Sequence, residues 1–240
     1  MNRFLKGAMI LTIAGVIVKI IGAFSKVLIA RILGGEGIGL YMMAYPIYQI
    51  IVSISAAGIP LAISIMIAEK LANRDMRGVQ QVFNVSLRVL TLVGIIFSVG
   101  LYASAEWLIK WNIITDSRAL IPIQLLSPAI IVVTILSCFR GYFQGFQYMV
   151  PTGTSQVFEQ IFRVGSMVGL AYYFIDSGLH LAAGGATFAT FPGVLAGLIV
   201  LVYFYRSQRS LRQQMLSEQN EEAPIERTSA VIKRLFALAI

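Results

Sequence analysis

Residues 7–33 read GAMILTIAGVIVKIIGAFSKVLIARIL, and this apolar run decides how the rest of the chain is interpreted. At about 1.5 Å per residue, it is long enough for a helix to cross a hydrocarbon layer roughly 30 Å thick. Two lysines, Lys19 and Lys26, interrupt it. With the helical period of 3.6, they fall on one face together with three small residues, Thr12, Gly15 and Gly22. The run therefore predicts a membrane helix with one small, cationic face.

The depth of the two lysines is unusual for a membrane helix. Lys19 lies about 18 Å from either end of the run, near the centre of the bilayer. A lysine there costs about 3 kcal/mol on the insertion scale, so we expect Lys19 to face a water-filled cavity or an anionic partner. Lys26 is about two turns from the far end, and it either shares that cavity or extends its ammonium group to the lipid head groups. Arg31 fits an interfacial anchor.

The composition indicates a membrane protein. Hydrophobic residues make up 58% of the 240 residues, charged residues only 12%, and the mean hydropathy is +0.80. Soluble domains carry about twice that charged fraction. Because apolar runs of 18 or more residues recur along the chain, we expect an all-α, multi-pass membrane protein.

Several other classes are excluded. The net charge of +8 does not indicate nucleic-acid binding, because most basic residues fall in short loops between apolar runs. One Cys and one His leave no disulfide framework and no metal or haem cluster. Residues 34–39 lack the spacing of a nucleotide-binding loop and predict a tight turn. No cleavage site follows the first run, so we expect a retained helix rather than a signal peptide. We expect no catalytic residues and no cofactor.

Six apolar spans predict a six-helix membrane lobe over residues 1–205, at about 7–33, 38–67, 82–109, 120–143, 155–175 and 181–205. Residues 68–80 predict a charged loop. Residues 206–229 are polar and predict a cytoplasmic linker, with room for one amphipathic helix or an interfacial anchor. Residues 230–240 repeat the basic-then-apolar pattern of the chain's start, so we expect a truncated seventh span there.

The distribution of basic residues predicts the orientation of the lobe. If the N-terminus is cytoplasmic, the outer segments contain only Arg31, Lys110 and Arg118. The inner segments then contain Arg3, Lys6, Lys70, Arg74, Arg77, Arg140, Arg163, Arg206, Arg209 and Arg212. This positive-inside bias places both ends of the six-helix lobe in the cytoplasm.

Further candidate residues lie in the second and third spans. Pro46, Gly58 and Pro60 predict a second span that is kinked or broken in two places, as in transporter helices that line a path and move. Proline and glycine are also simply commoner in membrane helices, so an ordinary structural role stays open. Arg88 lies about two turns inside the third span, where we favour extension to the loop over a place in a cavity.

In the fifth span, Gln156, Glu159, Gln160 and Arg163 share one helical face, with Glu159 and Arg163 spaced as an i,i+4 ion pair. Three glycine pairs have the spacing that permits close helix contact, which we interpret as packing: Gly141/Gly145, Gly165/Gly169 and Gly193/Gly197.

Three stretches resemble a known family. They are KIIGAFSKVLIARILG at residues 19–34, AGIPLAIS at 57–64 with AEK at 68–70, and RGYFQG at 140–145 followed by Pro151-Thr152 and Glu159-Gln160. Over residues 1–238 the chain resembles the amino-terminal lobe of the stage V sporulation protein B and lipid II flippase group. That group belongs to the multidrug/oligosaccharidyl-lipid/polysaccharide (MOP) exporter superfamily.

The resemblance implies a MATE-like lobe from a protein about twice this length, whose missing carboxy-terminal lobe is the expected partner. It also implies transport of an undecaprenyl-pyrophosphate-linked sugar to the outer leaflet by alternating access between two rocking lobes. Cationic residues on the first helix of this group face the cavity and are implicated in pyrophosphate binding. Lys19 matches one such position. The second aligns with Ser25, with Lys26 one residue on.

Three functions remain open on the sequence alone. The first is a flippase for lipid II or for another cell-surface polysaccharide precursor. The second is a cation-coupled multidrug exporter, which should carry acidic residues deep in its spans. The third is a membrane scaffold or enzyme subunit that does not transport. Because the deep charges are positive, the sequence favours an anionic, lipid-linked cargo, with the membrane lipids as surroundings.

Overall fold

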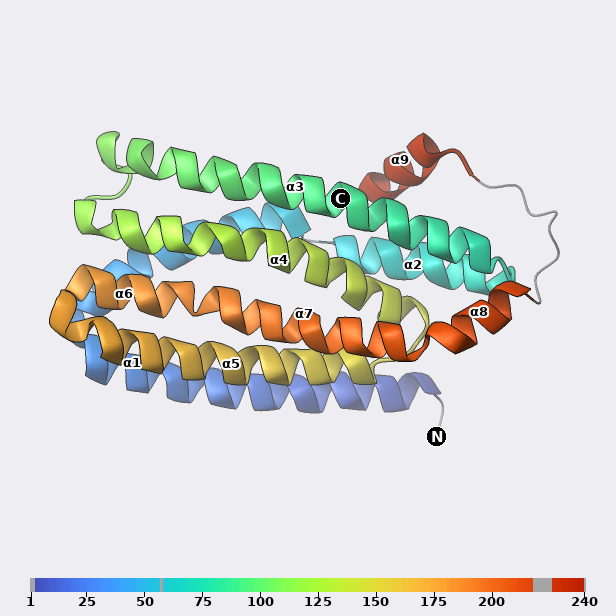
Figure 1. The fold of residues 1–240 in the computed structure, drawn as a ribbon, viewed down its shortest axis with the longest axis horizontal. Helices are drawn as coiled ribbons and strands as arrows, with labels where there is room; N and C mark the ends of the chain where they lie inside the picture. The colour runs from blue at the N-terminus through green and yellow to red at the C-terminus, as the bar shows by residue number, and fades with distance from the viewer. Residues whose placement is uncertain (1–2, 57, 218–225, 240) are drawn as a thin grey trace.

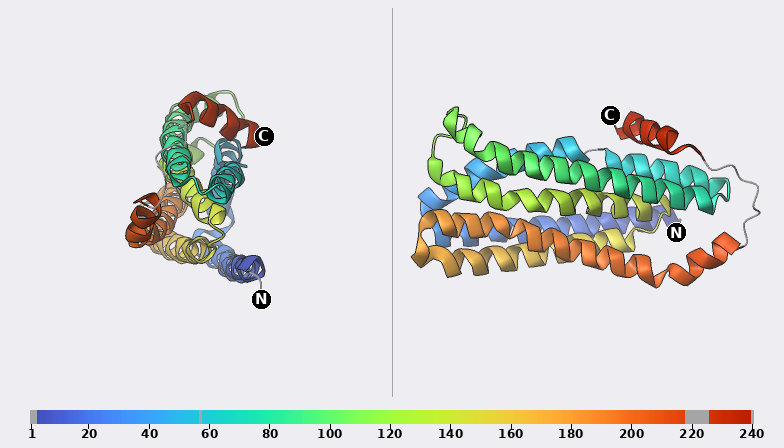
Figure 2. Two further views of the ribbon diagram at one scale, coloured as in Figure 1. Left: turned by 90° about the vertical axis from the view of Figure 1, so that its right-hand side faces the viewer. Right: turned by 45° about the horizontal axis from the view of Figure 1, so that its top comes forward.

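The computed structural model describes residues 3–56, 58–217 and 226–239, and this part of the chain is helical without any strand. Figure 1 shows an elongated bundle in which the long helices run along the long axis and the connections lie at its two ends. The views of Figure 2 show the same arrangement end-on and tilted. The all-α fold class is therefore confirmed.

The first helix, α1 (Arg3–Ala56), consists of two helical arms that meet at Gly34. Gly34 has φ 67° and ψ −175°, a conformation that glycine adopts without the steric penalty of a side chain. We call residues 3–33 the first arm and residues 35–56 the second arm. The turn expected over residues 34–39 is thus confined to Gly34, and the chain is helical again from residue 35.

The second predicted span, residues 38–67, is broken once. The second arm ends at Ala56, and α2 (Ile59–Ala72) begins after Gly58, which has φ 73°. Pro60 lies in the first turn of α2, where its missing N–H breaks no helical hydrogen bond. Pro46 lies inside the continuous second arm, so the expected second break does not occur there.

The predicted charged loop at residues 68–80 is wrong, because α2 continues to Ala72 and α3 (Met76–Lys110) begins four residues later. The Asp75 carboxylate accepts a hydrogen bond from the Gly78 N–H at 2.7 Å and so caps α3. Lys70 Nζ lies 3.2 Å from the same carboxylate. Charged side chains that suggested a loop instead close a tight turn between two helices.

The remaining elements are η1 (Ser117–Ala119), α4 (Leu120–Gly145), α5 (Val150–Phe174), η2 (Ile175–Ser177), α6 (Leu179–Phe188), α7 (Thr190–Ser207), α8 (Arg209–Ser217) and α9 (Thr228–Ala239). The sixth predicted span, residues 181–205, is divided at Ala189 between α6 and α7. The predicted linker, residues 206–229, includes α8 and the start of α9, and residues 218–225 lie outside the described residues.

Helix α9 lies where a seventh span was expected to begin. Its apolar residues Val231 and Leu235 are buried, and the helix packs against α2 and α3. Arg234 pairs with Glu69, and Lys70 Nζ lies 2.7 Å from Glu226 just before the helix. These contacts attach α9 to the turn end of α2, and residue 240 lies outside the described residues.

Helix α4 forms the centre of the bundle and packs against α1, α2, α3, α6 and α7. Two of its glycines make this close approach possible. A Cβ atom at Gly145 would lie 2.7 Å from the Ile67 Cβ of α2, and one at Gly141 would lie 2.8 Å from Ile63 Cβ.

The glycine pairs expected to mediate packing do not all do so. Gly193 and Gly197 of α7 are pressed against α5, as predicted. A Cβ atom at Gly165 or Gly169 would meet nothing within 4 Å, so packing does not explain that pair. The spacing alone does not distinguish a helix face that meets a neighbour from one that does not.

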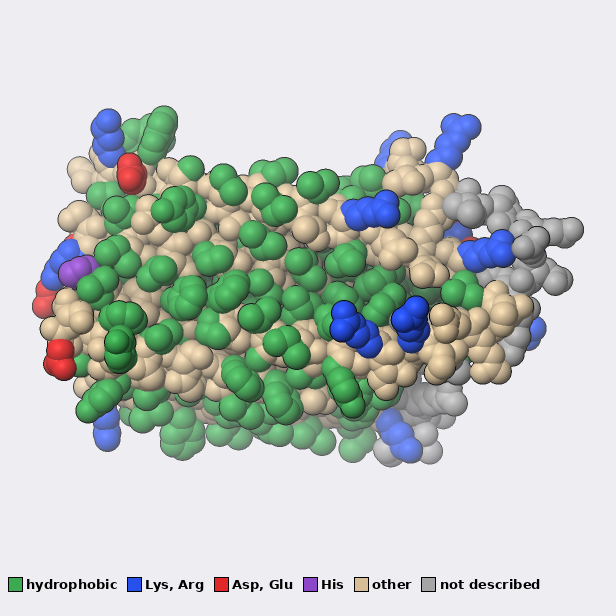
Figure 3. All heavy atoms as spheres, in the orientation of Figure 1, with side chains coloured by type: hydrophobic (Ala, Val, Ile, Leu, Met, Phe, Trp, Pro, Cys, Tyr) green, Lys and Arg blue, Asp and Glu red, His purple; other side chains and the backbone are tan. Residues whose placement is uncertain are grey.

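Four helical segments of the described chain are long and apolar enough to cross a membrane: Leu5–Ala72, Met76–Lys110, Ser117–Gly145 and Leu179–Ser207. Figure 3 shows one face of the bundle, with apolar side chains over its middle and charged ones gathered at its ends. The chain is accordingly a multi-pass membrane protein. The polar face of α5 lowers its hydropathy, and the six-span topology with cytoplasmic ends stays a prediction.

Candidate functional site

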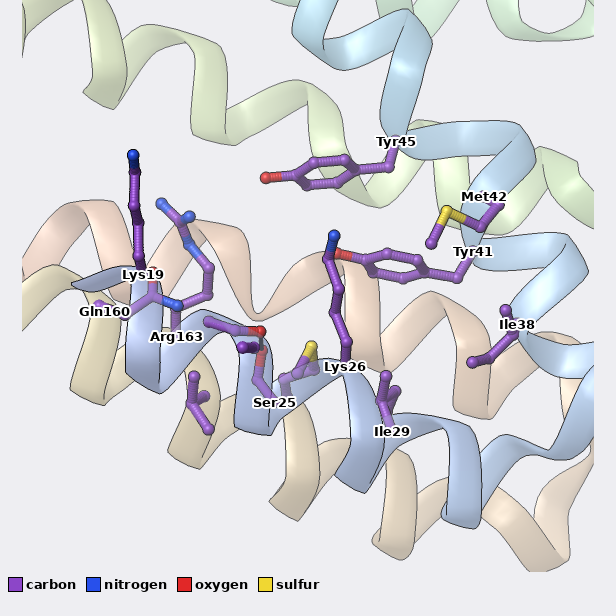
Figure 4. A pocket seen from close by; sticks show the side chains of 14 residues that line it. Lys19, Ser25, Lys26, Ile29, Ile38, Tyr41, Met42, Tyr45, Gln160 and Arg163 are labelled. Carbon is purple, nitrogen blue, oxygen red and sulfur yellow. Dashed lines mark hydrogen bonds between the residues drawn. The ribbon is translucent and has the colours of Figure 1, made fainter. Parts of the chain in front are cut away.

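A cavity of about 470 Å³ opens between the two arms of α1 and helix α5. The turn at Gly34 brings the second arm back toward the first, so residues 19–29 face residues 38–45 across the cavity. Figure 4 shows Lys19 and Lys26 on the first arm, with Tyr41 and Tyr45 extending toward them from the second. The structure thus brings both predicted lysines into one cavity.

The two lysines are exposed and line the cavity. No carboxylate among the described residues forms an ion pair with Lys19 or Lys26. Ser25 also lines the cavity, but its hydroxyl donates to the Gly22 carbonyl at 2.7 Å and its side chain is buried. Two unpaired ammonium groups about two helical turns apart on one face make this cavity attractive to an anion.

A third cation in the cavity is Arg163 of α5. In Figure 4 its guanidinium lies beside Lys19 and points the same way. Unlike the lysines, Arg163 is held by a carboxylate, because Glu159 one turn earlier pairs with it. Arg140 of α4 also reaches Glu159, with Nη2 2.8 Å from Oε2. The i,i+4 pair predicted from the sequence is therefore part of a three-residue cluster, Arg140–Glu159–Arg163, with one excess positive charge.

The cluster is buried enough for its charges to interact strongly. The side chains of Arg140, Glu159 and Arg163 are between 16% and 22% exposed. The Nε–H groups of both arginines are buried and have no hydrogen-bond partner in the described part of the chain. Incompletely satisfied charged groups inside a membrane protein are expensive, and they are found mainly at functional sites.

A second cavity, of about 410 Å³, shares two of its lining residues with the first. Arg163 and Tyr45 line both. The second cavity is also lined by Arg140 and Glu159, and on the second arm by Tyr48, Gln49 and Ser53. The two cavities are thus neighbours, with Tyr45 and Arg163 between them.

The other predicted site residues line neither of these two cavities. Pro46 and Arg88 are exposed and lie outside both. Gly58 contacts α9, since a Cβ atom there would lie 2.2 Å from the Ala239 carbonyl oxygen. The Pro60 carbonyl oxygen would lie 2.8 Å from a Cβ at Gly141. Gly58 and Pro60 thus shape the break before α2 and the packing around it.

Sequence reasoning overlooked several residues of the site. Tyr41, Tyr45 and Tyr48 recur at i, i+4 and i+7, a spacing that places three tyrosines on one face of the second arm. That signal was present but resembled an ordinary apolar stripe. Arg140 and Gln160 were noted as loop charge, as part of a helix face and within the family motifs, but not as site residues, because only the tertiary packing of α4 and α5 places them at the cavities.

The side chains at the two cavities are of the kinds that bind ligands. In the described residues, no group of three His, Cys, Asp or Glu side chains could hold a metal ion. Cations, tyrosines and amides facing a cavity provide groups that can bind a polar ligand.

Comparisons with known proteins agree with this fold. Residues 4–223 match the family described as polysaccharide biosynthesis protein. The chain is 34% identical over 211 residues to the stage V sporulation protein B of Bacillus subtilis, covering 88% of this chain and 40% of that protein. It is 29% identical over 225 residues to the lipid II flippase MurJ of B. subtilis, covering 89% of this chain and 41% of that protein.

The fold is shared with a solved structure of a multidrug resistance MATE family transporter of the MOP superfamily in an outward-facing conformation, with a TM-score of 0.78 at 14% identity. The match covers 98% of this chain and 50% of that one. The chain thus spans about half the length of the relatives that it matches, one of which is named a flippase and another a transporter. This chain belongs to the polysaccharide biosynthesis protein family, and its fold is that of one lobe of a MOP-superfamily transporter.

Proposed function

We propose that this chain forms one lobe of a flippase that moves an undecaprenyl-pyrophosphate-linked oligosaccharide from the inner to the outer leaflet. Lipid II, the peptidoglycan precursor, is the favoured substrate, and a precursor of another cell-surface polysaccharide is the alternative. The supporting relatives are a family of polysaccharide biosynthesis proteins and a protein named lipid II flippase. Alternating access would require a second lobe, which we expect to come from a further segment or partner.

The observation that carries the proposal is the pair of unpaired lysines in the cavity. A diphosphate brings at least two negative charges, and ammonium groups that form no ion pair in the described chain are suitable partners for it. Lysine is a flexible, strongly hydrated point charge, so it can release the diphosphate after transport. The polyprenyl tail would remain in the bilayer beside the exposed apolar face of the first arm.

A cation-coupled drug exporter fits the cavities less well. Such a site would need a free carboxylate to hold a cation. Glu159 is the acidic residue at the two cavities, and two arginines already pair with it. The cavities therefore favour an anionic cargo.

The test is a binding measurement on the 240-residue chain in lipid nanodiscs, with farnesyl diphosphate as a short-chain probe. Lys19→Gln and Lys26→Gln each remove one charge-assisted contact, worth about 1.5–3 kcal/mol, and should weaken binding about 10- to 100-fold. Lys110→Gln, at the end of α3 and away from both cavities, is the matched control. Unchanged affinity in both cavity variants would refute the proposed diphosphate site.

Transport and substrate choice need a separate assay. The gene and its Lys19→Gln variant are expressed in a flippase-depleted Gram-positive strain, with membrane levels checked for both. Rescue by the unchanged gene alone supports lipid II transport through the cationic cavity. Rescue by both would contradict a role for Lys19 in transport, and rescue by neither would favour another lipid-linked polymer.

A further inference from the structure

The second cavity differs from the first in its chemistry. Its wall on the second arm combines aromatic rings with neutral polar groups, namely Tyr45, Tyr48, Gln49 and Ser53. Opposite them lie Ser137 of α4 and the cluster Arg140–Glu159–Arg163. Donors, acceptors and flat apolar surfaces are thus present together, and a carboxylate lines this cavity where two lysines line the first.

The aromatic wall is fixed before any ligand enters. Tyr41 and Tyr45 stack at a ring-centroid distance of 5.3 Å, and Tyr45 lies 5.8 Å from Tyr48. Tyr48 is only 4% exposed, so its orientation is set by packing. A prearranged wall reduces the unfavourable entropy change of ordering side chains when a ligand binds.

The polar groups of this cavity match the hydrogen-bonding groups of a polyol. A sugar hydroxyl both donates and accepts hydrogen bonds, and Gln49, Ser53 and Ser137 can do the same. The Glu159 carboxylate accepts from both arginines and still has lone pairs available, while each guanidinium has more donors than the cluster uses. A diphosphate only accepts hydrogen bonds, so it could not donate to the acceptor oxygens of Glu159, Gln49 and the two serines.

We propose that the second cavity is the subsite for the glycosyl group attached to the diphosphate, with Tyr48 and Gln49 as its recognition residues. This proposal rests on the proposed function. Because Arg163 and Tyr45 line both cavities, a diphosphate held by Lys19 and Lys26 places the next group of the same molecule beside Arg163 and at the entrance of the second cavity. The pyranose ring then lies along the tyrosine wall, and its hydroxyl and amide groups bond to Gln49 and the cluster.

The test compares two probes of equal charge on the 240-residue chain in nanodiscs. One is farnesyl diphosphate esterified with a methyl group on its terminal phosphate, and the other carries an N-acetylglucosaminyl group at the same position. The intact chain should bind the glycosylated probe about tenfold more tightly. Gln49→Leu should lower that preference about fivefold, as expected for the loss of roughly 1 kcal/mol of hydrogen bonding, and leave the methyl ester's affinity unchanged.

Gln49 is exposed, so its replacement should not disturb folding. The second variant, Tyr48→Leu, removes one ring of the aromatic wall. Ile50→Leu is the control, since Ile50 is adjacent in sequence, 60% exposed and outside both cavities. Lys19→Gln should weaken both probes alike. Equal affinity of the intact chain for the two probes, or equal weakening of both by Gln49→Leu, would overturn the glycosyl subsite alone. Failure of both probes to bind would overturn the diphosphate site and the subsite together.

Discussion

Replacing Glu159 with glutamine tests whether the ion cluster is as strongly coupled as its geometry indicates. Glutamine has nearly the same shape but removes the negative charge that Arg140 and Arg163 share. The charge of the cluster rises from +1 to +2, and two guanidinium groups lose their counter-charge in a site that is at most 22% exposed. Removing one partner of a buried ion pair costs about 3–5 kcal/mol, and the residual exposure favours the lower end.

The expected loss of about 3 kcal/mol should appear in thermal unfolding of the detergent-solubilised chain. For a chain of this size, the midpoint temperature should fall by about 6–12 °C. Glu106→Gln is the matched control, because Glu106 is exposed on α3 and forms no ion pair in the described chain. It should change the midpoint by less than about 2 °C.

A double-mutant cycle separates charge coupling from a local packing defect. Arg140→Gln leaves a neutral Glu159–Arg163 pair and should cost less than Glu159→Gln. The combined variant should be more stable than the sum of the two losses predicts, because the second substitution removes a cation that the first one left unpaired. A Glu159→Gln midpoint indistinguishable from that of Glu106→Gln would refute the reasoning.

Gly145→Ala should destabilise the bundle by about 1–3 kcal/mol, because the new Cβ would lie 2.7 Å from Ile67 Cβ. Gly100→Ala is the control, since its new Cβ would meet nothing within 4 Å. It should be neutral or slightly stabilising in the same unfolding assay. Equal effects of the two would contradict the close α2–α4 packing. At the α3–α4 connection, the Arg118 side chain and N–H donate hydrogen bonds to Asp116 and lower the pKa of its carboxyl group below the usual value. This stabilising contact is present above the unfolded-state pKa and is lost as the pH falls through the lowered folded-state pKa. Arg118→Gln removes the hydrogen-bond donor side chain, so an NMR titration should show a higher titration midpoint for Asp116 in this variant.

The prediction of the fold from sequence succeeded where the lipid bilayer determines the secondary structure. Apolar runs in a bilayer must be helical, because unsatisfied backbone groups cannot be left in lipid, so the all-α class followed directly. The errors lie at connections. The charged residues at 68–80 suggested a loop, yet Asp75 and Lys70 close a three-residue turn between helices. Likewise Gly34 turns the chain within one residue, which hydropathy does not report.

The candidate site was predicted in part. Lys19 and Lys26 were found because a charge deep in an apolar run is costly wherever the chain folds, and both line the first cavity. Pro46, Gly58, Pro60 and Arg88 were chosen for local reasons and line neither of the two cavities. Local signals such as a proline or a helix break do not show which side of a helix faces a cavity.

The sequence by itself determined that this chain is a bundle of membrane helices with a cationic first helix, since both properties depend only on the composition and spacing within single segments. The tertiary structure alone decided that Arg140 joins Glu159 and Arg163, and that the tyrosines of the second arm face the lysines of the first. Those contacts join residues from different helices. Helix packing depends on the shapes of side chains from several neighbouring helices at once, so the periodicity of any one segment does not predict it.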